Sequence, residues 1–274
     1  MITEYKITDK EFDLFSTLVY KESGIRLGEN KKSLLVSRLS KRLRILGLQT
    51  FKEYFDKHLK NENDGELIQM LDLISTNKTS FFREQAHFDF LRQVILPVLS
   101  SVKQIKIWSS ACSSGEEPYS IAMTLYDNVA NPNQWNFRIL ASDISTRVLA
   151  RAQEGFYDVN QVSEIGNAKV KLHFLRGKGK DEGKVRVKSH LREIVSFNRI
   201  NLMDERYPVK NDLDIIFCRN VMIYFDRSTQ ENLMIKFFRY LKPGGYVFIG
   251  HSETLQWLDH PYQYVAPTIY RKPL

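Results

Sequence analysis

The 274-residue sequence predicts a doubly wound α/β domain with a mostly parallel sheet, a small all-helical N-terminal domain and an inserted antiparallel β-subdomain. Helical periodicity without any strand pattern fills residues 1–75. From about residue 105 onward, short apolar runs alternate with helical stretches, which indicates a parallel sheet covered on both faces. A glycine-rich basic stretch at 176–188 interrupts this alternation and is typical of a hairpin.

The N-terminal domain is expected to hold four helices. Thr8 or Asp9 can cap the first, in which apolar residues recur at helical spacing. A break rich in turn formers, 22–30, separates it from the second helix, and Gly47 ends the second. The other three helices are predicted at 31–46, 51–59 and 67–74.

The helix predicted at 31–46 carries six cations and no acid. Leucines form one stripe along it and cations form another, but Leu34 and Ile45 interrupt the basic stripe, so the helix is imperfectly amphipathic. A charged stripe is most often a solvated face. Because no acid on this helix balances the cations, a docking surface for an acidic partner is the alternative. The cations are Lys31, Lys32, Arg38, Lys41, Arg42 and Arg44.

Residues 76–92 join the two domains, and their polar start allows two interpretations. Thr79 or Ser80, followed by Glu84, can cap a helix. Alternatively, the segment is a linker that folds over a ligand, where Arg83 meets a carboxylate and Asn77 and Thr79 offer hydrogen bonds.

The second domain, 93–274, is predicted to alternate strands and helices. A late segment, 262–272, is expected to add an antiparallel edge strand, and the β-subdomain is placed at about 170–193. The predicted strands are Ile105–Trp108, Phe137–Ala141, Ile194–Asn198, Asp214–Phe217 and Tyr246–Gly250, and the predicted helices are Pro118–Val129, Thr146–Gln153 and Ser228–Leu241.

Two strand ends predict a cofactor site. After the first strand, small residues around Gly115 let a ligand approach the backbone, and Asp143 ends the next strand, where nucleotide-binding folds hold a ribose. The three-glycine dinucleotide fingerprint is absent, and Glu116 and Glu117 would repel a pyrophosphate. An adenosine-bearing cofactor with a positive centre and no phosphate, S-adenosylmethionine, fits better; a purely structural turn is the alternative.

A third candidate segment follows the fourth strand. Arg219 and Asn220 stand at its carboxyl end, where ligands of open α/β sheets bind. Tyr224 either points its hydroxyl at a reacting centre or belongs to the core. The six histidines show no metal-binding spacing, so no metal site is predicted.

The composition of the chain limits the classes of partner and the cellular location that are expected. The formal net charge is +8, which favours an acidic partner such as nucleic acid, anionic lipid or an acidic protein surface. No apolar run approaches the roughly 20 residues of a membrane span. The start Met1–Lys6 lacks the features of a signal peptide, so a cytoplasmic location is expected.

Six stretches of the sequence together resemble the CheR-type chemotaxis receptor methyltransferases. The resemblance covers nearly the whole chain, including the helical domain, and implies a Rossmann-like class I methyltransferase fold. The stretches are TNKTSFFRE (76–84), IWSSACSSGEEPYSIAM (107–123), ASDIS (141–145), NLMDERY (201–207), IFCRNVMIYFDRST (216–229) and LKPGGYVFIGHSE (241–253).

The resemblance implies transfer of a methyl group from S-adenosylmethionine to glutamate side chains of chemoreceptors, which serves sensory adaptation. The products would be glutamyl methyl esters and S-adenosylhomocysteine. It assigns catalytic roles to Tyr224 and Arg83, the ribose to Asp143, and the adenine to Asn201 and Leu202. The implied cofactor-binding residues are Asn77, Thr79, Arg83, Glu117, Asp143, Asn201, Leu202, Arg219 and Asn220.

The resemblance also implies partners. The basic helix would meet the receptor's methylation helices, and the hairpin would bind a receptor's C-terminal pentapeptide. A monomer that uses no metal, binds no nucleic acid and does not insert into membranes is expected. Lys78 departs from the family, in which this residue is often apolar. The implied docking residues are Arg38, Lys41, Arg42 and Arg44, and the implied pentapeptide-binding residues are Gly177, Gly179, Gly183 and Arg186.

Two other classes of function compete with this one. A nucleic-acid methyltransferase would suit the positive charge, but amino-group methylases carry an Asn/Asp-Pro-Pro-aromatic stretch after the fourth strand. Here that place reads Arg219-Asn-Val-Met222, without proline. A cofactor-binding sensor without turnover is the second alternative, and the intact cofactor motifs argue against it without excluding it.

Overall fold

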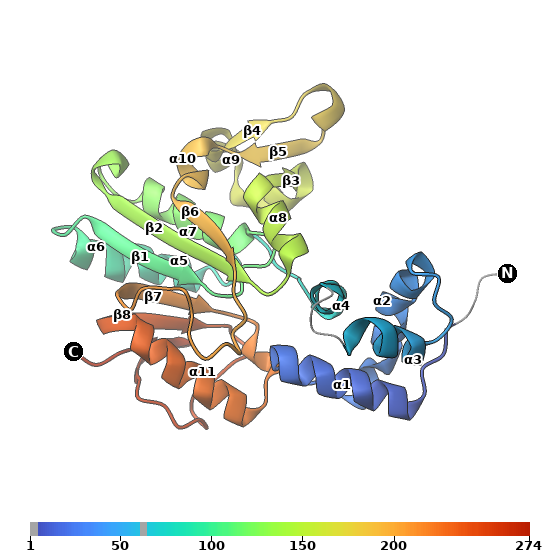
Figure 1. Cartoon of the computed structure of the whole chain (residues 1–274). Coiled ribbons are helices and arrows are strands. Elements are labelled where there is room, and N and C mark those ends of the chain that lie inside the picture. Colours follow the sequence, from blue (N-terminus) through green and yellow to red (C-terminus); the bar gives the residue numbers. More distant parts are fainter. Residues whose placement is uncertain (1–4, 61–64) are drawn as a thin grey trace.

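The computed structural model describes residues 5–60 and 65–274. It shows three parts: a helical domain, a large sheet with helices on both faces, and a small sheet that projects from the large domain (Figure 1). The predicted fold class is therefore confirmed.

The helical domain packs around an aromatic core. Thr8 caps the first helix: its hydroxyl accepts the backbone N–H of Glu11, and the Glu11 carboxylate accepts the backbone N–H of Thr8. Phe15, Phe51 and Tyr54 are fully buried at the centre. The elements are α1 (Asp9–Ser23), a 3₁₀ turn (Glu29–Lys31), α2 (Lys32–Ile45), α3 (Phe51–Tyr54), a π turn (Phe55–Leu59) and α4 (Glu66–Ile74).

The large sheet has seven strands in the order β6-β2-β1-β7-β8-β10-β9. The five strands from β6 to β8 are parallel, and β10 and β9 are antiparallel additions at the edge. The prediction of one late edge strand is corrected to two short ones. The bounds are β1 (Gln104–Ser109), β2 (Asn136–Asp143), β6 (Val195–Arg199), β7 (Leu213–Cys218), β8 (Leu241–Ile249), β9 (Gln263–Ala266) and β10 (Ile269–Arg271).

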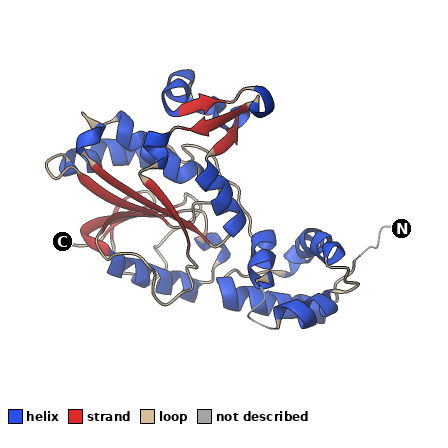
Figure 2. Ribbon diagram, turned by 45° about the horizontal axis from the view of Figure 1, so that its top comes forward, coloured by secondary structure: helices blue, strands red, loops and turns tan. Residues whose placement is uncertain are grey.

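Alternating side chains of the central strands enter two cores. Ile215 and Phe217 of β7 pack in the core that holds α5 and α7, whereas Ile216 and Cys218 pack in the core that holds α11. Both faces of the sheet are thus covered (Figure 2). The helices of this domain are α5 (Ala86–Phe90), a π turn (Leu91–Ile95), α6 (Leu96–Leu99), α7 (Glu116–Asp127), α8 (Thr146–Glu154), α9 (Asn167–His173), α10 (Ser189–Arg192) and α11 (Arg227–Tyr240).

The linker predicted at 76–92 becomes helical at Ala86, within α5. The interpretation of Thr79 or Ser80 as a helix cap is wrong, because no helix begins between residues 79 and 84. Phe82 and Glu84 instead have left-handed backbones, with φ of 52° and 60°. Glu84 contacts the end of β7 through its side chain.

The small antiparallel sheet has the strand order β3-β5-β4. The hairpin predicted near 176–188 is confirmed as β4 (Phe174–Arg176) and β5 (Lys184–Val187). The third strand, β3 (Phe156–Asp158), was not predicted, and the insert therefore starts well before residue 170. Short 3₁₀ turns lie at Val159–Ile165 and Gly179–Asp181. Among residues 5–60 and 65–274, no helix is both long and apolar enough to cross a membrane.

Candidate cofactor pocket

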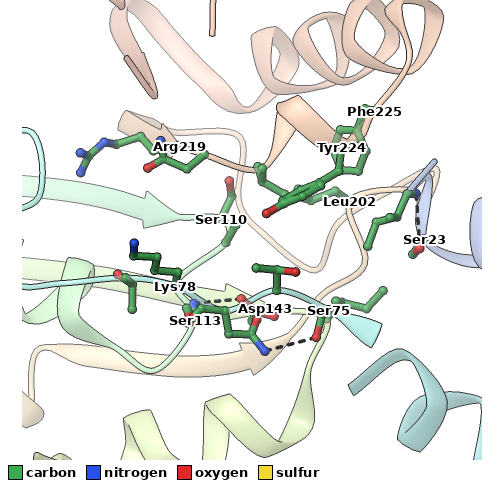
Figure 3. Close-up of a pocket in the computed structure, with 18 of the residues that line it drawn as sticks. Ser23, Ser75, Lys78, Ser110, Ser113, Asp143, Leu202, Arg219, Tyr224 and Phe225 are labelled. Atoms are coloured by element: carbon green, nitrogen blue, oxygen red, sulfur yellow. Dashed lines mark hydrogen bonds between the residues drawn. The ribbon is translucent and has the colours of Figure 1, made fainter. Parts of the chain in front are cut away.

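A pocket lies where the carboxyl ends of the parallel strands meet the helical domain. Segments from both domains line it, including the loop after α1, residues 74–80, and the ends of β1, β2 and β7. Figure 3 shows this site. All nine residues predicted to bind a cofactor line it, together with Tyr224: Asn77, Thr79, Arg83, Glu117, Asp143, Asn201, Leu202, Arg219 and Asn220.

Asp143 ends β2 and is the buried acid at the floor of the pocket. Its carboxylate accepts the backbone N–H groups of Ser113 (2.9 Å) and Ser145 (3.0 Å). Burial raises the pKa of Asp143, and these two N–H groups oppose that shift. Each oxygen keeps a further lone pair, so the carboxylate can accept hydroxyl groups of a ligand.

Glu117, Arg219 and Glu84 form a buried chain of charges at one wall. Arg219 Nη1 donates to Glu117 Oε2 (3.0 Å), and Arg219 Nη2 donates to Glu84 Oε2 (2.9 Å). The Arg219 side chain is only 2% exposed. Ser109 also donates its hydroxyl to Glu117 (2.7 Å). In Figure 3 the Arg219 guanidinium lies well away from the Tyr224 ring.

Tyr224 follows β7 in a short 3₁₀ turn, Met222–Tyr224. Its ring is partly buried against the core around α11, and it also lines the pocket, with its hydroxyl pointing inward (Figure 3). Within residues 5–60 and 65–274, no side chain or backbone group hydrogen-bonds to this hydroxyl, so it is available to a ligand. Tyr224 therefore lies between the core and the pocket, and its role beside a reacting centre stays a prediction.

The loop before α5 forms a second wall through its backbone. Asn77 Nδ2 donates to Ser75 Oγ (3.2 Å), and the Asn77 carbonyl accepts from Ser113 Oγ (3.3 Å). Arg83 Nη1 donates to the Lys78 carbonyl (3.0 Å). These contacts tie the loop to the end of β1 and hold the Arg83 side chain against its own loop.

The helical domain contributes to the pocket, which the sequence analysis did not foresee. The backbone N–H of Arg26 donates to the Tyr224 carbonyl (2.9 Å), and Asn201 Nδ2 donates to the Glu22 carbonyl (2.5 Å). Ser23 and Leu34 also line the site. The turn-rich break at 22–30 was the available signal, because loops between rigid elements are common places for ligand contacts.

The prediction that the cations of the basic helix, α2, form a docking surface needs a correction. Arg38 donates to the carbonyls of Leu73, Ile74 and Ser75 at the end of α4. Arg42 forms a two-bond ion pair with Glu66 (2.7 and 2.5 Å). The premise that the cations lack counter-charges is therefore wrong for Arg42, and also for Lys32, which pairs with Asp9. Lys41 and Arg44 are exposed, and docking by these residues stays a prediction.

The hairpin glycines have structural roles that the sequence did not reveal. A Cβ at Gly177 would lie 2.0 Å from the Asp181 carbonyl oxygen, so only glycine fits there. Gly179 and Gly183 have φ of 59° and 81°. Arg186 lies on the central strand, where its Nε donates to the Glu154 carbonyl (3.2 Å). Peptide binding by these four residues stays a prediction.

Comparison with known proteins gives two family matches. Residues 77–270 match the CheR methyltransferase, SAM binding domain, and residues 10–75 match the CheR methyltransferase, all-alpha domain. A chemotaxis protein methyltransferase of Borreliella burgdorferi is 44% identical, over 97% of this chain and 95% of its own. The chain is also similar to a chemotaxis protein methyltransferase of Salmonella typhimurium (38% identical, over 98% of this chain and 92% of the relative) and to chemotaxis protein methyltransferase 2 of Pseudomonas aeruginosa (41% identical, over 97% and 94%).

Proposed function

Because the chain belongs to the CheR family of chemotaxis methyltransferases, which use S-adenosylmethionine, we propose that it methylates glutamate side chains of chemoreceptors. The products are glutamyl methyl esters and S-adenosylhomocysteine. The cytoplasm is the proposed site of the reaction, and a monomer is the proposed working form.

The observation that carries this proposal is the pocket itself. Its floor is a buried carboxylate, Asp143, and its wall is a chain of two carboxylates around one guanidinium. Asp143 and Glu117 line the pocket, and Glu84 lies behind Arg219. These carboxylates can attract the sulfonium and ammonium groups of the cofactor, on walls that also carry Arg26, Lys31, Lys78 and Arg83. The lack of the three-glycine dinucleotide fingerprint in the sequence fits the same cofactor.

Within this pocket we assign roles by position. Asp143 holds the ribose hydroxyls, because each carboxylate oxygen has a lone pair left after the backbone bonds. Leu202, 7% exposed, offers an apolar surface for the adenine beside Asn201. Asn77, Thr79 and the other pocket residues hold the remaining groups.

The bound cofactor supplies an electrophilic methyl group, and the protein has little acid–base work to do. The acceptor glutamate has an ordinary pKa of about 4.3, so it is already an anionic nucleophile at neutral pH. Opposite charges approach each other, and exclusion of water strengthens this attraction. The main tasks of the chain are to orient the acceptor and to exclude water. Tyr224 and Arg83, which both line the pocket, are the candidates for these tasks.

The receptor is proposed to approach over the helical domain. Lys41 and Arg44 are the exposed cations among the four docking candidates of α2, and they suit an acidic helical substrate. The two partly buried candidates, Arg38 and Arg42, contact α4 and support this surface from the side of the core. No contact with nucleic acid or insertion into a membrane is needed for this reaction.

A tethering role is proposed for the small sheet. Strand β4 is an edge strand, since β5 lies between it and β3. Unpaired backbone groups of an edge strand can pair with an extended peptide. A receptor C-terminal pentapeptide would add here, beside the turn that contains Gly177, Gly179 and Gly183. Binding of that peptide to the wild-type protein, measured by calorimetry, tests the assignment.

One experiment separates this function from its alternatives. The protein is incubated with cofactor labelled in the methyl group and with receptor-bearing membranes, and the product is treated with alkali. Release of labelled methanol indicates a carboxyl ester. Label on RNA or DNA offered instead would favour a nucleic-acid methyltransferase, and cofactor binding without transfer would favour a sensor.

A further inference from the structure

We propose that Glu84 is a positioning residue that sets the affinity for S-adenosylmethionine without touching it. Glu84 does not itself line the pocket. Its side chain does contact Arg219 and Asn220, and both of these residues line the pocket. The inference rests on the proposed function only through the identity of the cofactor.

Glu84 joins three segments that are far apart in the chain. Its Oε2 accepts from Arg219 Nε (3.3 Å) and Nη2 (2.9 Å). Its Oε1 accepts from Asn220 Nδ2 (3.1 Å) and from the backbone N–H of His251 (3.1 Å). Arg219 also donates to the Arg83 carbonyl. The linker is thereby fixed to the loops that follow β7 and β8.

The backbone of Glu84 shows that this position is held under strain. Its φ is 60°, in the left-handed region that residues with a side chain seldom adopt. Such a conformation persists where surrounding contacts determine it, and it is commonly found at functional sites. Here the contacts that hold it are the four hydrogen bonds of its own carboxylate.

Charge explains how Glu84 would act at a distance. Burial alone would raise its pKa, but Arg219 and the other donors outweigh burial and lower the pKa to about 2. Burial raises the pKa of Glu117, and Arg219 and Ser109 oppose that shift. While Glu117 is ionised, Glu84, Arg219 and Glu117 together carry a net charge of one negative unit, which attracts the positive groups of the cofactor. Without the Glu84 charge, Arg219 would neutralise Glu117 instead, and this attraction would be lost.

A metal site at the same place is the competing interpretation. Glu84, His87 and His251 bring ligand atoms within 4.8 Å of one another. However, Oε2, the oxygen of Glu84 nearest both imidazoles, already accepts two N–H groups of Arg219. The positive guanidinium at this oxygen disfavours a second cation, so the positioning role is preferred.

The test measures S-adenosylmethionine binding to the full chain by calorimetry. Wild-type protein must bind; failure to bind would overturn the proposed function and this inference together. Glu84→Gln keeps the size of the side chain and removes its charge, and it is expected to weaken binding at least tenfold. Because Glu84 acts through Arg219, the same change made in an Arg219→Gln background should alter affinity less than twofold.

Two results would overturn the inference while the proposed function stands. One is Glu84→Gln protein that binds within twofold of wild type. The other is an equal loss in the Arg219→Gln background, which would indicate a direct or general effect. In steady-state assays the KM for the cofactor should rise, whereas loss of folded protein would lower kcat alone.

Two further variants guard against misfolding. Glu66→Gln removes a comparably buried ion pair, with Arg42 in the helical domain, and should lower thermal stability while leaving cofactor affinity within twofold. If Glu84→Gln does not fold, the Arg219→Lys variant tests the inference instead. Lysine keeps the positive charge but cannot contact both carboxylates and the Arg83 carbonyl at once. This variant should bind at least tenfold more weakly, and wild-type affinity would overturn the inference.

Discussion

Replacement of Arg42 by alanine should destabilise the protein far more than its place on a basic helix suggests. Arg42 donates two hydrogen bonds to Glu66, at 2.7 and 2.5 Å. The Glu66 side chain is 5% exposed and that of Arg42 is 19% exposed. In Arg42→Ala the buried Glu66 carboxylate would lose both of these hydrogen bonds and keep the one from the Tyr54 hydroxyl, at 2.7 Å.

The expected loss of unfolding free energy follows from the burial of Glu66 and Arg42. Removal of one partner from a buried ion pair costs about 3–5 kcal/mol, whereas exposed pairs contribute about 0–1 kcal/mol. Since Arg42 retains some contact with water, we expect a loss of about 3 kcal/mol for Arg42→Ala. Substitutions at the exposed residues Lys41 and Arg44 should stay within about 0.5 kcal/mol.

Urea denaturation followed by circular dichroism measures this difference, and pH supplies a second readout. Burial alone would raise the pKa of Glu66, but hydrogen bonds from Arg42 and Tyr54 outweigh it and lower the pKa below 4.5. The stabilisation from the pair is thus complete above pH 4.5 and is lost as the pH falls through the lowered folded-state pKa. Arg42→Ala should flatten this dependence.

A receptor methylation assay distinguishes the exposed cations Lys41 and Arg44 from the buried ion pair of Arg42 and Glu66. Lys41→Glu with Arg44→Glu should slow receptor methylation and leave both stability and cofactor affinity unchanged, as the docking proposal requires. An unfolding free energy of Arg42→Ala within about 0.5 kcal/mol of wild type would refute the reasoning, because it would show that the buried pair contributes nothing.

Three further changes test the pocket and the small sheet. Asp143→Ala removes the proposed ribose contact and should weaken S-adenosylmethionine binding about 100-fold in calorimetry, since two hydrogen bonds to a charged group contribute about 3 kcal/mol or more; unchanged affinity would exclude the ribose role. Tyr224→Phe keeps the ring and should lower kcat with little change in cofactor affinity; an unaltered kcat would place Tyr224 in the core only. Gly177→Ala forces a Cβ to 2.0 Å from the Asp181 carbonyl and should abolish pentapeptide binding while cofactor binding persists; retained peptide binding would contradict the hairpin assignment.

Local patterns in the chain were sufficient to predict most elements. Apolar runs of strand length gave β1, β2, β6 and β7 within a few residues of their observed bounds. The pattern is strongest for the central strands β1 and β7, which contribute side chains to the cores on both faces of the sheet. The third strand of the small sheet escaped prediction because β3 has only three residues and is fixed by pairing with β5, about 28 positions later in the chain. Such a short strand carries too little pattern to stand out.

The sequence by itself determined the class of fold, the acid at the end of β2 and the residue types that suit a positively charged cofactor. These depend on periodicity and on the rule that carboxyl ends of parallel strands meet at one edge. Only the tertiary structure decided which charges are paired. Arg42, predicted as a docking cation, pairs with Glu66, and Glu84, predicted as part of a helix cap, pairs with Arg219. Ion pairs between distant segments depend on how those segments pack in three dimensions. The spacing of charged residues along the sequence does not indicate which of them will be in contact.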